Sequence, residues 1–332
     1  MAEWNDYWGT PAWLDEVDAW VSMVLETYEL HRTAPLERGA VQLWSTQIVV
    51  HTDHGKLFFK AVNPGQQSEV ALTAAAARIA PDQLVMPLAV EPLRGWMISP
   101  DYGETMARIP STDYQLWGRI LRDFARLQRR LAPHGDELFD AGLGQLDPAF
   151  LPGYIDEQLL LHASLPAGHP LHLPERDAED LHRQLGPVRE MAAFLAAGPV
   201  PLSLDHNDLH RGNAFLPASP EEPLRFIDLG DAYWAHPFAS LAMPLGTMSK
   251  ELGTTPGDPR IRTVVNAYLH EWQDYGSVED LRHYIEPALR LGKLQAHATW
   301  MRMLTGASDA DLERHAAQVL RPLSELVSPL TL

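Results

Sequence analysis

Three side chains in two short segments have the types and the spacing that phosphoryl transfer requires. Asp208 and Asn213 lie five residues apart in the segment 206–213 (HNDLHRGN), and Asp228 follows a predicted strand fifteen residues after Asn213. A carboxylate on a loop can accept the proton of an attacking hydroxyl. An amide oxygen and a second carboxylate can hold Mg²⁺ on the phosphates of a nucleotide. Each residue alone would suggest a turn, but the two segments together predict this chemistry.

Lys60 and Glu69 form a second candidate group. The chain has only four lysines among its 26 Lys and Arg residues, yet Lys60 lies in an otherwise apolar predicted strand. A compact ammonium there can reach the α- and β-phosphates of a nucleotide. Glu69 begins a predicted helix nine residues later, where it can hold Lys60 by a salt bridge. The alternatives are a solvent-facing strand residue and a first-turn acid that favours the helix dipole.

The first hundred residues predict the strand-rich part that would carry Lys60. Thr10 is expected to cap a helix that begins at Pro11, and a β-hairpin, an Ala-rich helix and two further strands follow. These later elements are expected at residues 47–50 with 57–62, 68–80, 84–90 and 95–99. We place the boundary of this first domain, residues 1–100, at residues 100–103.

Beyond residue 103 the apolar spacing is mostly that of helices. Helices are expected at residues 116–131, 155–165 and 176–197, a strand at 201–204, a second hairpin at 214–216 with 224–227, and capping boxes at 277–280 and 308–311. Residues 101–332 are therefore expected to form a second, helical domain with the catalytic loop, the metal site and the acceptor pocket.

The pattern HNDLHRGN followed by FIDLGD resembles the aminoglycoside phosphotransferase and choline kinase family, the small-molecule branch of the protein-kinase-like fold. The resemblance covers most of the chain in layout, and its specific residues lie at 206–231. It implies an α+β, bilobal protein-kinase-like fold with a β-rich N-terminal lobe and a mostly helical C-terminal lobe. It also implies a kinase of a small hydroxylated molecule that uses ATP or GTP and Mg²⁺.

The same resemblance implies the role of each candidate residue. Asp208 would be the catalytic base, and Asn213 and Asp228 would be the magnesium ligands. Lys60 would contact the phosphates with Glu69 as its partner. The segment 98–103 would be the hinge that binds the base of the nucleotide through its backbone, with the candidate residues Ser99, Asp101 and Tyr102.

The chain departs from the family pattern at two places. Asn207 stands where the family usually has glycine, beside the base, where its side chain would narrow the acceptor pocket or make a hydrogen bond. The region expected to cover the phosphates, residues 37–46, contains only Gly39. Asp231 is the candidate acceptor contact. An aminoglycoside, an amino sugar, a choline-like alcohol or another metabolite would fit, because a fold does not fix a substrate.

Two other functions remain open at this stage. One is a nucleotide-binding regulator that keeps the fold but catalyses weakly. The other is a metal-dependent hydrolase, because His206, Asp208 and His210 form a His-x-Asp-x-His pattern. In the kinase interpretation His206 instead orders the catalytic loop through a side-chain hydrogen bond.

Composition limits the partners that we expect. The net charge is −18, which argues against a nucleic-acid partner and favours a cationic small acceptor. The absence of cysteine excludes disulfides and thiolate metal sites. The sequence has no apolar stretch of membrane-spanning length and no basic leader, and it suggests no obligate protein partner. We therefore expect a cytoplasmic protein without a membrane partner.

Overall fold

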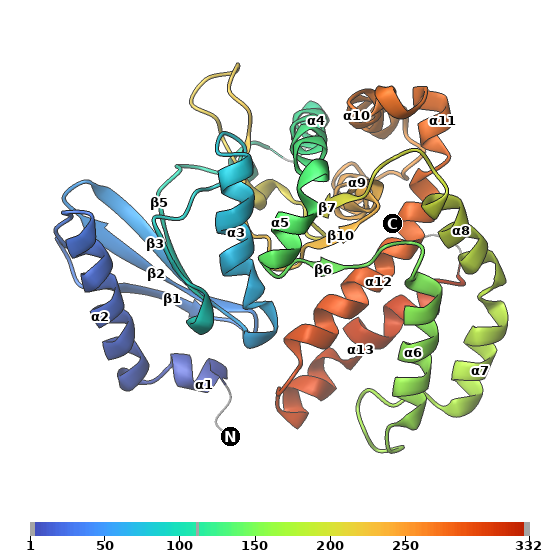
Figure 1. Ribbon diagram of the computed structural model, residues 1–332, viewed down its shortest axis with the longest axis horizontal. Helices are drawn as coiled ribbons and strands as arrows, with labels where there is room; N and C mark the ends of the chain where they lie inside the picture. Colours follow the sequence, from blue (N-terminus) through green and yellow to red (C-terminus); the bar gives the residue numbers. More distant parts are fainter. Residues whose placement is uncertain (1–3, 111–112, 329–332) are drawn as a thin grey trace.

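The computed structural model describes residues 4–110 and 113–328. It has an α+β fold of two lobes, with the β-rich lobe at the left of Figure 1 and the mostly helical lobe at the right. The predicted fold class is confirmed, whereas the division at residues 100–103 stays a prediction. Within the described ranges no helix is both long and apolar enough to cross a membrane.

The β-rich lobe contains a five-stranded antiparallel sheet in the order β1-β2-β3-β5-β4. Its strands are β1 (Glu37–Val41), β2 (Ser45–Thr52), β3 (Gly55–Val62), β4 (Ala89–Glu91) and β5 (Trp96–Pro100). The predicted hairpin is confirmed as β2 and β3, which turn at Gly55, where φ is +114° and favours glycine. The register places Lys60 inside the sheet, opposite Gln47 on β2 and Met97 on β5.

The predicted strand at 84–90 is wrong for most of its length. Only the end of that segment joins the sheet, as part of β4. Leu84 instead forms an isolated bridge with Phe226 of the helical lobe, and the Val85 amide donates to the Phe226 carbonyl at 3.1 Å. Pro87 lacks the amide hydrogen that a continuous ladder needs, which explains the break.

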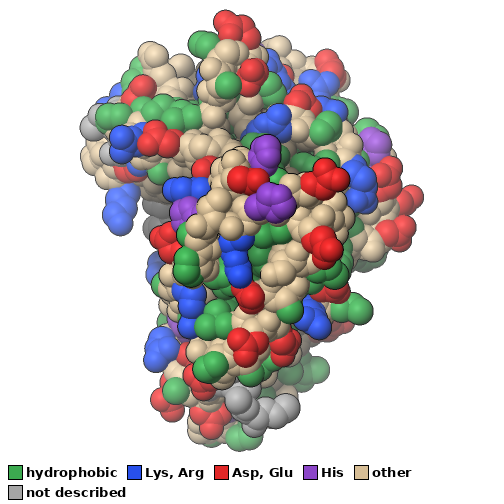
Figure 2. Space-filling view, turned by 90° about the vertical axis from the view of Figure 1, so that its left-hand side faces the viewer, with side chains coloured by type: hydrophobic (Ala, Val, Ile, Leu, Met, Phe, Trp, Pro, Cys, Tyr) green, Lys and Arg blue, Asp and Glu red, His purple; other side chains and the backbone are tan. Residues whose placement is uncertain are grey.

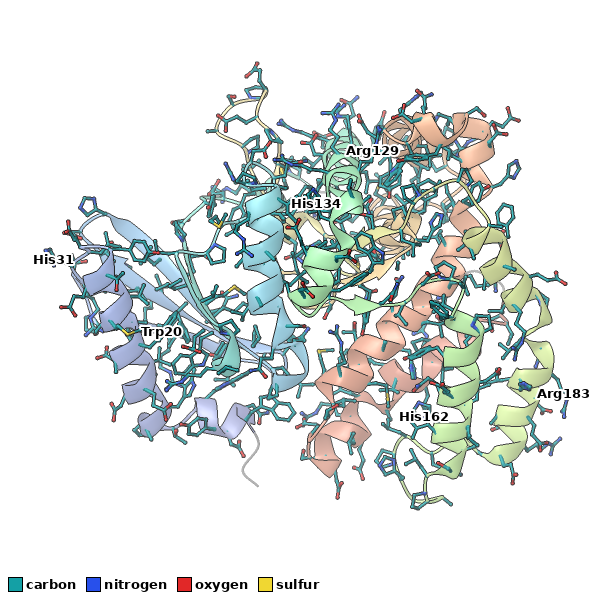
Figure 3. The ribbon with its side chains drawn as sticks, viewed as in Figure 1. Trp20, His31, Arg129, His134, His162 and Arg183 are labelled. Atoms are coloured by element: carbon teal, nitrogen blue, oxygen red, sulfur yellow. The ribbon has the colours of Figure 1, made fainter. Side chains whose placement is uncertain are left out.

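Helix α2 (Pro11–Thr27) covers one face of the sheet, next to the short helix α1 (Trp4–Trp8). Thr10 caps α2 as predicted, because its side chain accepts a hydrogen bond from the Trp13 amide. Trp20 points from α2 toward the sheet (Figure 3) and meets the Phe59 ring at 5.8 Å between centroids. Since successive strand residues face opposite sides, Phe59 in this core directs Lys60 to the other face of the sheet.

Helix α3 (Ser68–Ile79) connects the β-rich lobe to the helical core. Leu72, Ala76 and Ala77 are buried in the same cluster as residues of α4 (Tyr114–Leu131). Small side chains allow this close packing. The first turn of α3 therefore holds Glu69 at the junction of the two lobes.

Helices make up most of the second lobe. Besides α4 they are α5 (Gly135–Asp140), α6 (Leu151–Ser164), α7 (Glu175–Gln184), α8 (Gly186–Ala196), α9 (Ala242–Glu251), α10 (Pro259–His270), α11 (Val278–Arg282), α12 (Ile285–Met303) and α13 (Asp309–Glu325). The prediction of one helix at 176–197 is wrong, because α7 and α8 separate at Leu185. Pro187 fits the first turn of α8 but disfavours a continuous helix across that point. Ser277 completes its predicted capping box, and Ser308 caps α13.

Five short strands shape the loops of the candidate site. They are β6 (Gly144–Gln145), β7 (Ser203–Asp205), β8 (Ala214–Phe215), β9 (Arg225–Phe226) and β10 (Tyr233–Ala235). β8 and β9 form the predicted second hairpin. The segment 206–213 runs from β7 to β8, and Asp228 follows β9. Pairing of β8 with β9 therefore brings this segment and Asp228 to the same end of the hairpin.

His236 is the buried N-cap of a 3-10 helix (Pro237–Leu241), and its protonation should destabilise the fold. Its Nδ1 accepts a hydrogen bond from the Phe238 amide, and burial lowers its pKa to about 3. Because this folded pKa lies below the unfolded value of about 6.5, the stabilisation is complete above pH 6.5 and is lost as the pH falls. When the pH is lowered from 7.5 to 5.5, the free energy of unfolding of wild type should fall by about 1.4 kcal/mol more than that of His236→Asn. Urea titrations at the two pH values measure this difference. Between pH 8.5 and 7.5 the two proteins should show the same change, and an equal loss on acidification would contradict the prediction.

Candidate active site

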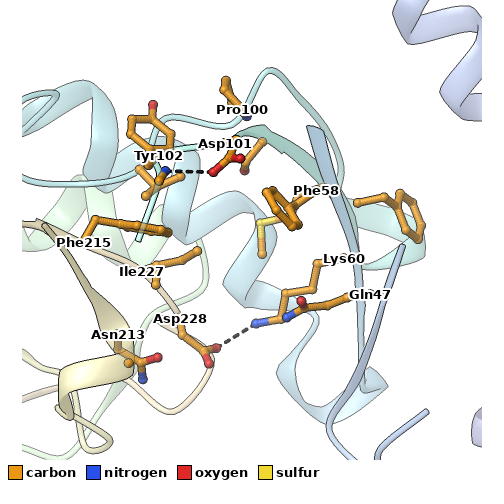
Figure 4. Close-up of a pocket in the computed structure, with 16 residues that line it drawn as sticks. Gln47, Phe58, Lys60, Pro100, Asp101, Tyr102, Asn213, Phe215, Ile227 and Asp228 are labelled. Carbon is orange, nitrogen blue, oxygen red and sulfur yellow. Dashed lines mark hydrogen bonds and ion pairs between the residues drawn. The ribbon is translucent and has the colours of Figure 1, made fainter. Parts of the chain in front are cut away.

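Lys60 links the two lobes at the centre of the site. Its Nζ lies 2.6 Å from Glu69 Oε1 and 2.7 Å from Asp228 Oδ1, so the expected salt bridge with Glu69 is present. Burial works to lower the pKa of Lys60, but the two carboxylates raise it above its ordinary value. Figure 4 shows Lys60 and Asp228 pointing toward each other beside a cavity. A charged ammonium is therefore held at this position by one residue from each lobe.

Asp228 has an unusual backbone conformation that its neighbours maintain. Its φ is +71°, a left-handed angle that non-glycine residues rarely adopt. The preceding carbonyl, of Ile227, accepts a hydrogen bond from His206 Nε2 at 3.0 Å, and the Gly230 carbonyl accepts one from Arg302 at 3.1 Å. Burial opposes ionisation of Asp228, but Lys60 lowers its pKa below the ordinary value. The carboxylate is thus charged and fixed in direction.

Gly230 leaves no room for a side chain beside this ion pair. A Cβ there would lie 2.8 Å from Glu69 Oε2 and 3.1 Å from Gln66 Nε2. Both contacting groups are held by other partners, Lys60 and Asp231. We expect Gly230→Ala to displace the Lys60–Glu69 pair and to raise the dissociation constant of a nucleoside triphosphate probe about tenfold, a loss of about 1.4 kcal/mol.

The control for this change is Gly118→Ala in α4, where an added Cβ meets nothing within 4 Å. Alanine should stabilise that helix by roughly 0.5–1 kcal/mol without changing the dissociation constant of the probe. An unchanged dissociation constant in Gly230→Ala would show that the close approach does not matter for binding at Lys60.

The segment 206–213 is closed by Asn213. Its Nδ2 donates a hydrogen bond to the Asp208 backbone carbonyl at 3.0 Å, so the amide oxygen takes no part in this hydrogen bond. Burial and the nearby Asp228 charge raise the pKa of Asp208 to about 6. A carboxyl group with such a pKa is ionised at pH 7 and is still basic enough to take a proton.

The backbone conformation of Asn207 explains how this chain can have asparagine at a position where the resembled family usually has glycine. Its φ is +60°, in the left-handed region that glycine adopts freely and that asparagine tolerates better than most residues. Its Nδ2 donates to Thr299 Oγ1 of α12 at 3.2 Å. The substitution thus keeps the turn and adds a hydrogen bond at the wall of a cavity.

The first of two cavities at the site has a volume of about 270 Å³ and lies between the sheet and the β8–β9 hairpin. The candidate hinge residues Asp101 and Tyr102 line one end (Figure 4), and Lys60, Asn213 and Asp228 line the other. Ser99 also lines this cavity. Its apolar walls are formed by Phe58, Met97, Phe215 and Ile227. An apolar cavity with charged groups at one end matches a nucleotide in polarity.

The second cavity, of about 340 Å³, shares Lys60 and Asp228 with the first. Asp208 and Asp231 make one side of it acidic, and Asn207 also lines it. Its apolar side is formed by Trp44, Met243, Ala296, Trp300 and Met303. The structure therefore brings Asp208 and Asn213 together but directs them to different cavities, which meet at Asp228.

Asp231 is held in the second cavity by a residue that the sequence analysis missed. Gln66, in a 3-10 helix (Pro64–Gln66), donates from Nε2 to Asp231 Oδ1 at 2.6 Å. Burial, together with Asp228 and Asp208, raises the pKa of Asp231 to about 6. No local sequence pattern could have identified Gln66, because its partner lies 165 residues away.

Asp205 is a second residue that was missed. It is fully buried and accepts hydrogen bonds from the Ser240 hydroxyl and from the Asn207 amide, so it supports the loop before Asp208. A carboxylate at the end of the predicted apolar strand, next to HNDLHRGN, was a signal that could have revealed it.

The histidines around Asp208 serve different neighbours. His206 is fully buried and makes the bond to Ile227 described above, whereas His210 Nε2 lies 3.5 Å from Asp208 Oδ2. Burial lowers the pKa of both histidines. Across the part of the chain that the structure describes, no group of three or more His, Asp or Glu side chains is arranged to hold a metal ion.

The sequence places the chain in a known family. It belongs to the phosphotransferase enzyme family, whose sequence model matches residues 41–281. That range includes every candidate site residue, so the resemblance inferred from the motifs is confirmed at the level of the family. No curated protein matches the chain in sequence.

Solved structures with this fold carry several activities in their names. A macrolide 2'-phosphotransferase type I has a TM-score of 0.57 and 13% identity, with 97% of this chain and 99% of that chain covered. A Plasmodium vivax ethanolamine kinase has a TM-score of 0.61 and 14% identity, covering 87% and 81%. APH(2")-IIia, solved with GDP and kanamycin, has a TM-score of 0.59 and 14% identity, covering 92% and 98%. At these identities the likeness shows the protein-kinase-like fold, which is thereby confirmed.

Proposed function

We propose that this phosphotransferase moves the γ-phosphoryl group of ATP to a hydroxyl group of a small molecule. The observation that carries the proposal is that two cavities meet at Lys60 and Asp228. One has the polarity that suits a nucleotide, and the other presents the Asp208 carboxylate. A phosphoryl donor in one cavity and an acceptor in the other would meet beside the charged side chains of Lys60 and Asp228. Positioning of the two substrates and neutralisation of charge between them are the main requirements of phosphoryl transfer.

In the first cavity Lys60 would contact the phosphates, with Glu69 fixing its direction. The backbone near Ser99, Asp101 and Tyr102 would bind the base of ATP or GTP. The ring centroids of Tyr102 and Phe215 lie 5.8 Å apart, which supports an aromatic slot at this end. The apolar lining would exclude water from the base.

The donor set at the boundary suits magnesium. Asp228 supplies a carboxylate, and the Asn213 side chain presents its amide oxygen because its nitrogen donates a hydrogen bond to the Asp208 backbone carbonyl. Hard oxygen donors of this kind are the ligands that Mg²⁺ prefers. When bound there, the ion would neutralise charge on the phosphates.

In the second cavity Asp208 would act as the base. The acceptor oxygen would form a bond to the γ-phosphorus while the bond from that phosphorus to the β–γ bridging oxygen breaks and ADP leaves. The hydroxyl proton would pass to Asp208, whose raised pKa favours acceptance close to neutral pH. Asp205 and Asn207 would keep that carboxylate in place through the backbone of the loop.

The acceptor is proposed to be cationic. Asp208 and Asp231 give the second cavity its acidic side, and the indole of Trp300 is a surface on which a cation can lie. On the face seen in Figure 2, Lys and Arg side chains are interspersed with Asp and Glu, which supports a small acceptor in preference to nucleic acid. We further propose a cytoplasmic protein whose lobes divide at residues 100–103, without an obligate protein or membrane partner.

The regulator and hydrolase alternatives have less support. A weakly catalytic regulator would not need the base, the metal donors and Lys60 to meet at one boundary. A hydrolase of the His206/Asp208/His210 type would need both histidines as ligands, yet His206 is buried against Ile227.

The decisive experiment is a transfer screen with Mg-[γ-³²P]ATP over hydroxylated metabolites, choline, ethanolamine and aminoglycosides. Asp208→Asn protein serves as the blank. Labelled product from wild type alone would support the proposal. Labelled product at equal rates from both proteins would reject Asp208 as the base, and ATP binding without any product would favour the regulator.

A further inference from the structure

The turn between β1 and β2 forms a wall of the second cavity. Trp44 and Ser45, at the end of this turn, both line it. Trp44 is 45% exposed, which is unusual for so large an apolar side chain. An indole at this position adds an aromatic surface from the β-rich lobe to a cavity whose other apolar residues come from the helical lobe.

Asn63 fixes this turn from behind. It is fully buried, and its Nδ2 donates to the carbonyls of Leu43 and Met303, each at 3.0 Å. Its Oδ1 accepts a hydrogen bond from the Gly65 amide at 2.7 Å, and its backbone amide donates to the Trp44 carbonyl at 2.8 Å. Both hydrogens of the side-chain amide and its oxygen therefore have partners, which makes this a rigid connection.

The partners of Asn63 belong to three segments that line the second cavity. These are the β1–β2 turn with Trp44, the 3-10 helix with Gln66, and the end of α12 with Met303. The backbones also touch, because a Cβ at Gly65 would lie 2.0 Å from the Arg302 carbonyl. Asn63 thus holds the β-rich lobe against α12 at the point where the cavity wall crosses between them.

We propose that Trp44 contacts the acceptor and determines specificity, and that Asn63 is the positioning residue that holds Trp44 over the cavity. The proposal rests on the proposed function, because it takes the second cavity as the acceptor site. The buried side-chain amide of Asn63 and the end of α12 hold the β1–β2 turn in place. The turn therefore does not need a glycine-rich sequence. The acceptor class that it selects is a molecule with an apolar or cationic face beside the reacting hydroxyl, which the indole can cover.

The kinetic test compares Trp44→Ala and Trp44→Phe with wild type, using whichever of choline, ethanolamine and kanamycin is phosphorylated best. The alanine variant should raise the acceptor KM about tenfold or more and leave the Mg-ATP KM within about twofold. Phenylalanine should restore most of the loss. Phe150→Ala, at an exposed aromatic that lines neither cavity, is the control. An unchanged acceptor KM, or equal losses for both substrates, would overturn the specificity role.

The role of Asn63 is tested by combining variants. Asn63→Ala should raise the acceptor KM as Trp44→Ala does, and the double variant should be no worse than Asn63→Ala alone, because both changes remove the same contact. Gln83→Ala is the matched control. Gln83 is also a buried amide, and it donates to the Asp123 carbonyl. Effects that add independently would reduce Asn63 to a general stabilising residue and overturn the positioning role.

Amide hydrogen exchange tests the same connection without any acceptor. Asn63→Ala should accelerate exchange at least about tenfold in peptides that cover residues 42–46 and 303–305, whereas Gln83→Ala should not. Unchanged exchange at the turn would overturn the proposal. If wild type transfers phosphate to none of the three probes, the proposed function fails in the screen, while this measurement still decides whether Asn63 holds the turn.

Discussion

Asp208→Asn should slow phosphoryl transfer by about 10²–10⁴-fold while Mg-ATP still binds. The amide has nearly the shape of the carboxylate, so the loop that Asn213 closes should stay intact. It cannot accept the acceptor proton, however, because its nitrogen already carries two hydrogens and its oxygen is only weakly basic. Steady-state transfer rates with the best acceptor from the screen, together with the dissociation constant of Mg-ATP, measure the two effects separately.

A matched control for this variant is Asp123→Asn, which places an amide at another buried aspartate. Asp123 accepts the Leu224 amide hydrogen and lines neither cavity. It should alter stability but keep transfer within about a few fold of wild type. Wild-type turnover in Asp208→Asn would remove Asp208 from the role of base, and loss of Mg-ATP binding would mean that the substitution disturbs the nucleotide site instead.

The sequence was sufficient for the parts of the site that depend on short segments. The motif 206–213 and Asp228 lie beside a short hairpin, so local strand pairing alone brings them together. Lys60 was predictable because lysine is rare in this chain and this one lies in an apolar strand; alternation in β3 then places it on the face opposite Phe59. Glu69 follows from the start of a helix that must pack against the same sheet.

The wrong predictions arise where tertiary contacts outweigh a local pattern. Residues 84–90 have strand composition, but their first part pairs with Phe226 of the other lobe and leaves the sheet. The helical pattern across 176–197 hides the break that Pro187 imposes. Tyr233 and Trp234 follow Asp231 closely in the sequence, but the pairing of β10 with β7 buries both.

Residues that connect the lobes could not be predicted at all. Asn63 and Met303 are 240 residues apart, and Gln66 and Asp231 are 165 apart. Asparagine before a proline suggests only a turn, and glutamine in a loop suggests a solvated side chain. Their function depends on how α12 meets the sheet, which no local spacing encodes.

Asp228→Asn should abolish the dependence of nucleotide binding on magnesium. The proposed metal would lose its only charged protein ligand, so we expect the affinity for Mg-ATP to fall by about 100-fold or more. Without magnesium we expect Asp228→Asn to have the opposite effect on the affinity for ATP. Asp228 Oδ1 lies 2.7 Å from Lys60 Nζ, so neutralising Asp228 removes a negative charge next to the phosphates and frees Lys60 to bind them. In EDTA the variant should therefore bind ATP as tightly as wild type or more tightly.

Calorimetric titrations of ATP with and without Mg²⁺ measure both effects on the same protein. Asp231→Asn is the control, because this carboxylate lies in the second cavity and is not a proposed ligand; it should keep the magnesium dependence of wild type. A general disruption of the site by Asp228→Asn would weaken binding in both conditions, whereas loss of a metal ligand weakens it only when magnesium is present. A magnesium titration unchanged from wild type would exclude Asp228 as a ligand, and the boundary between the two cavities would then need another explanation.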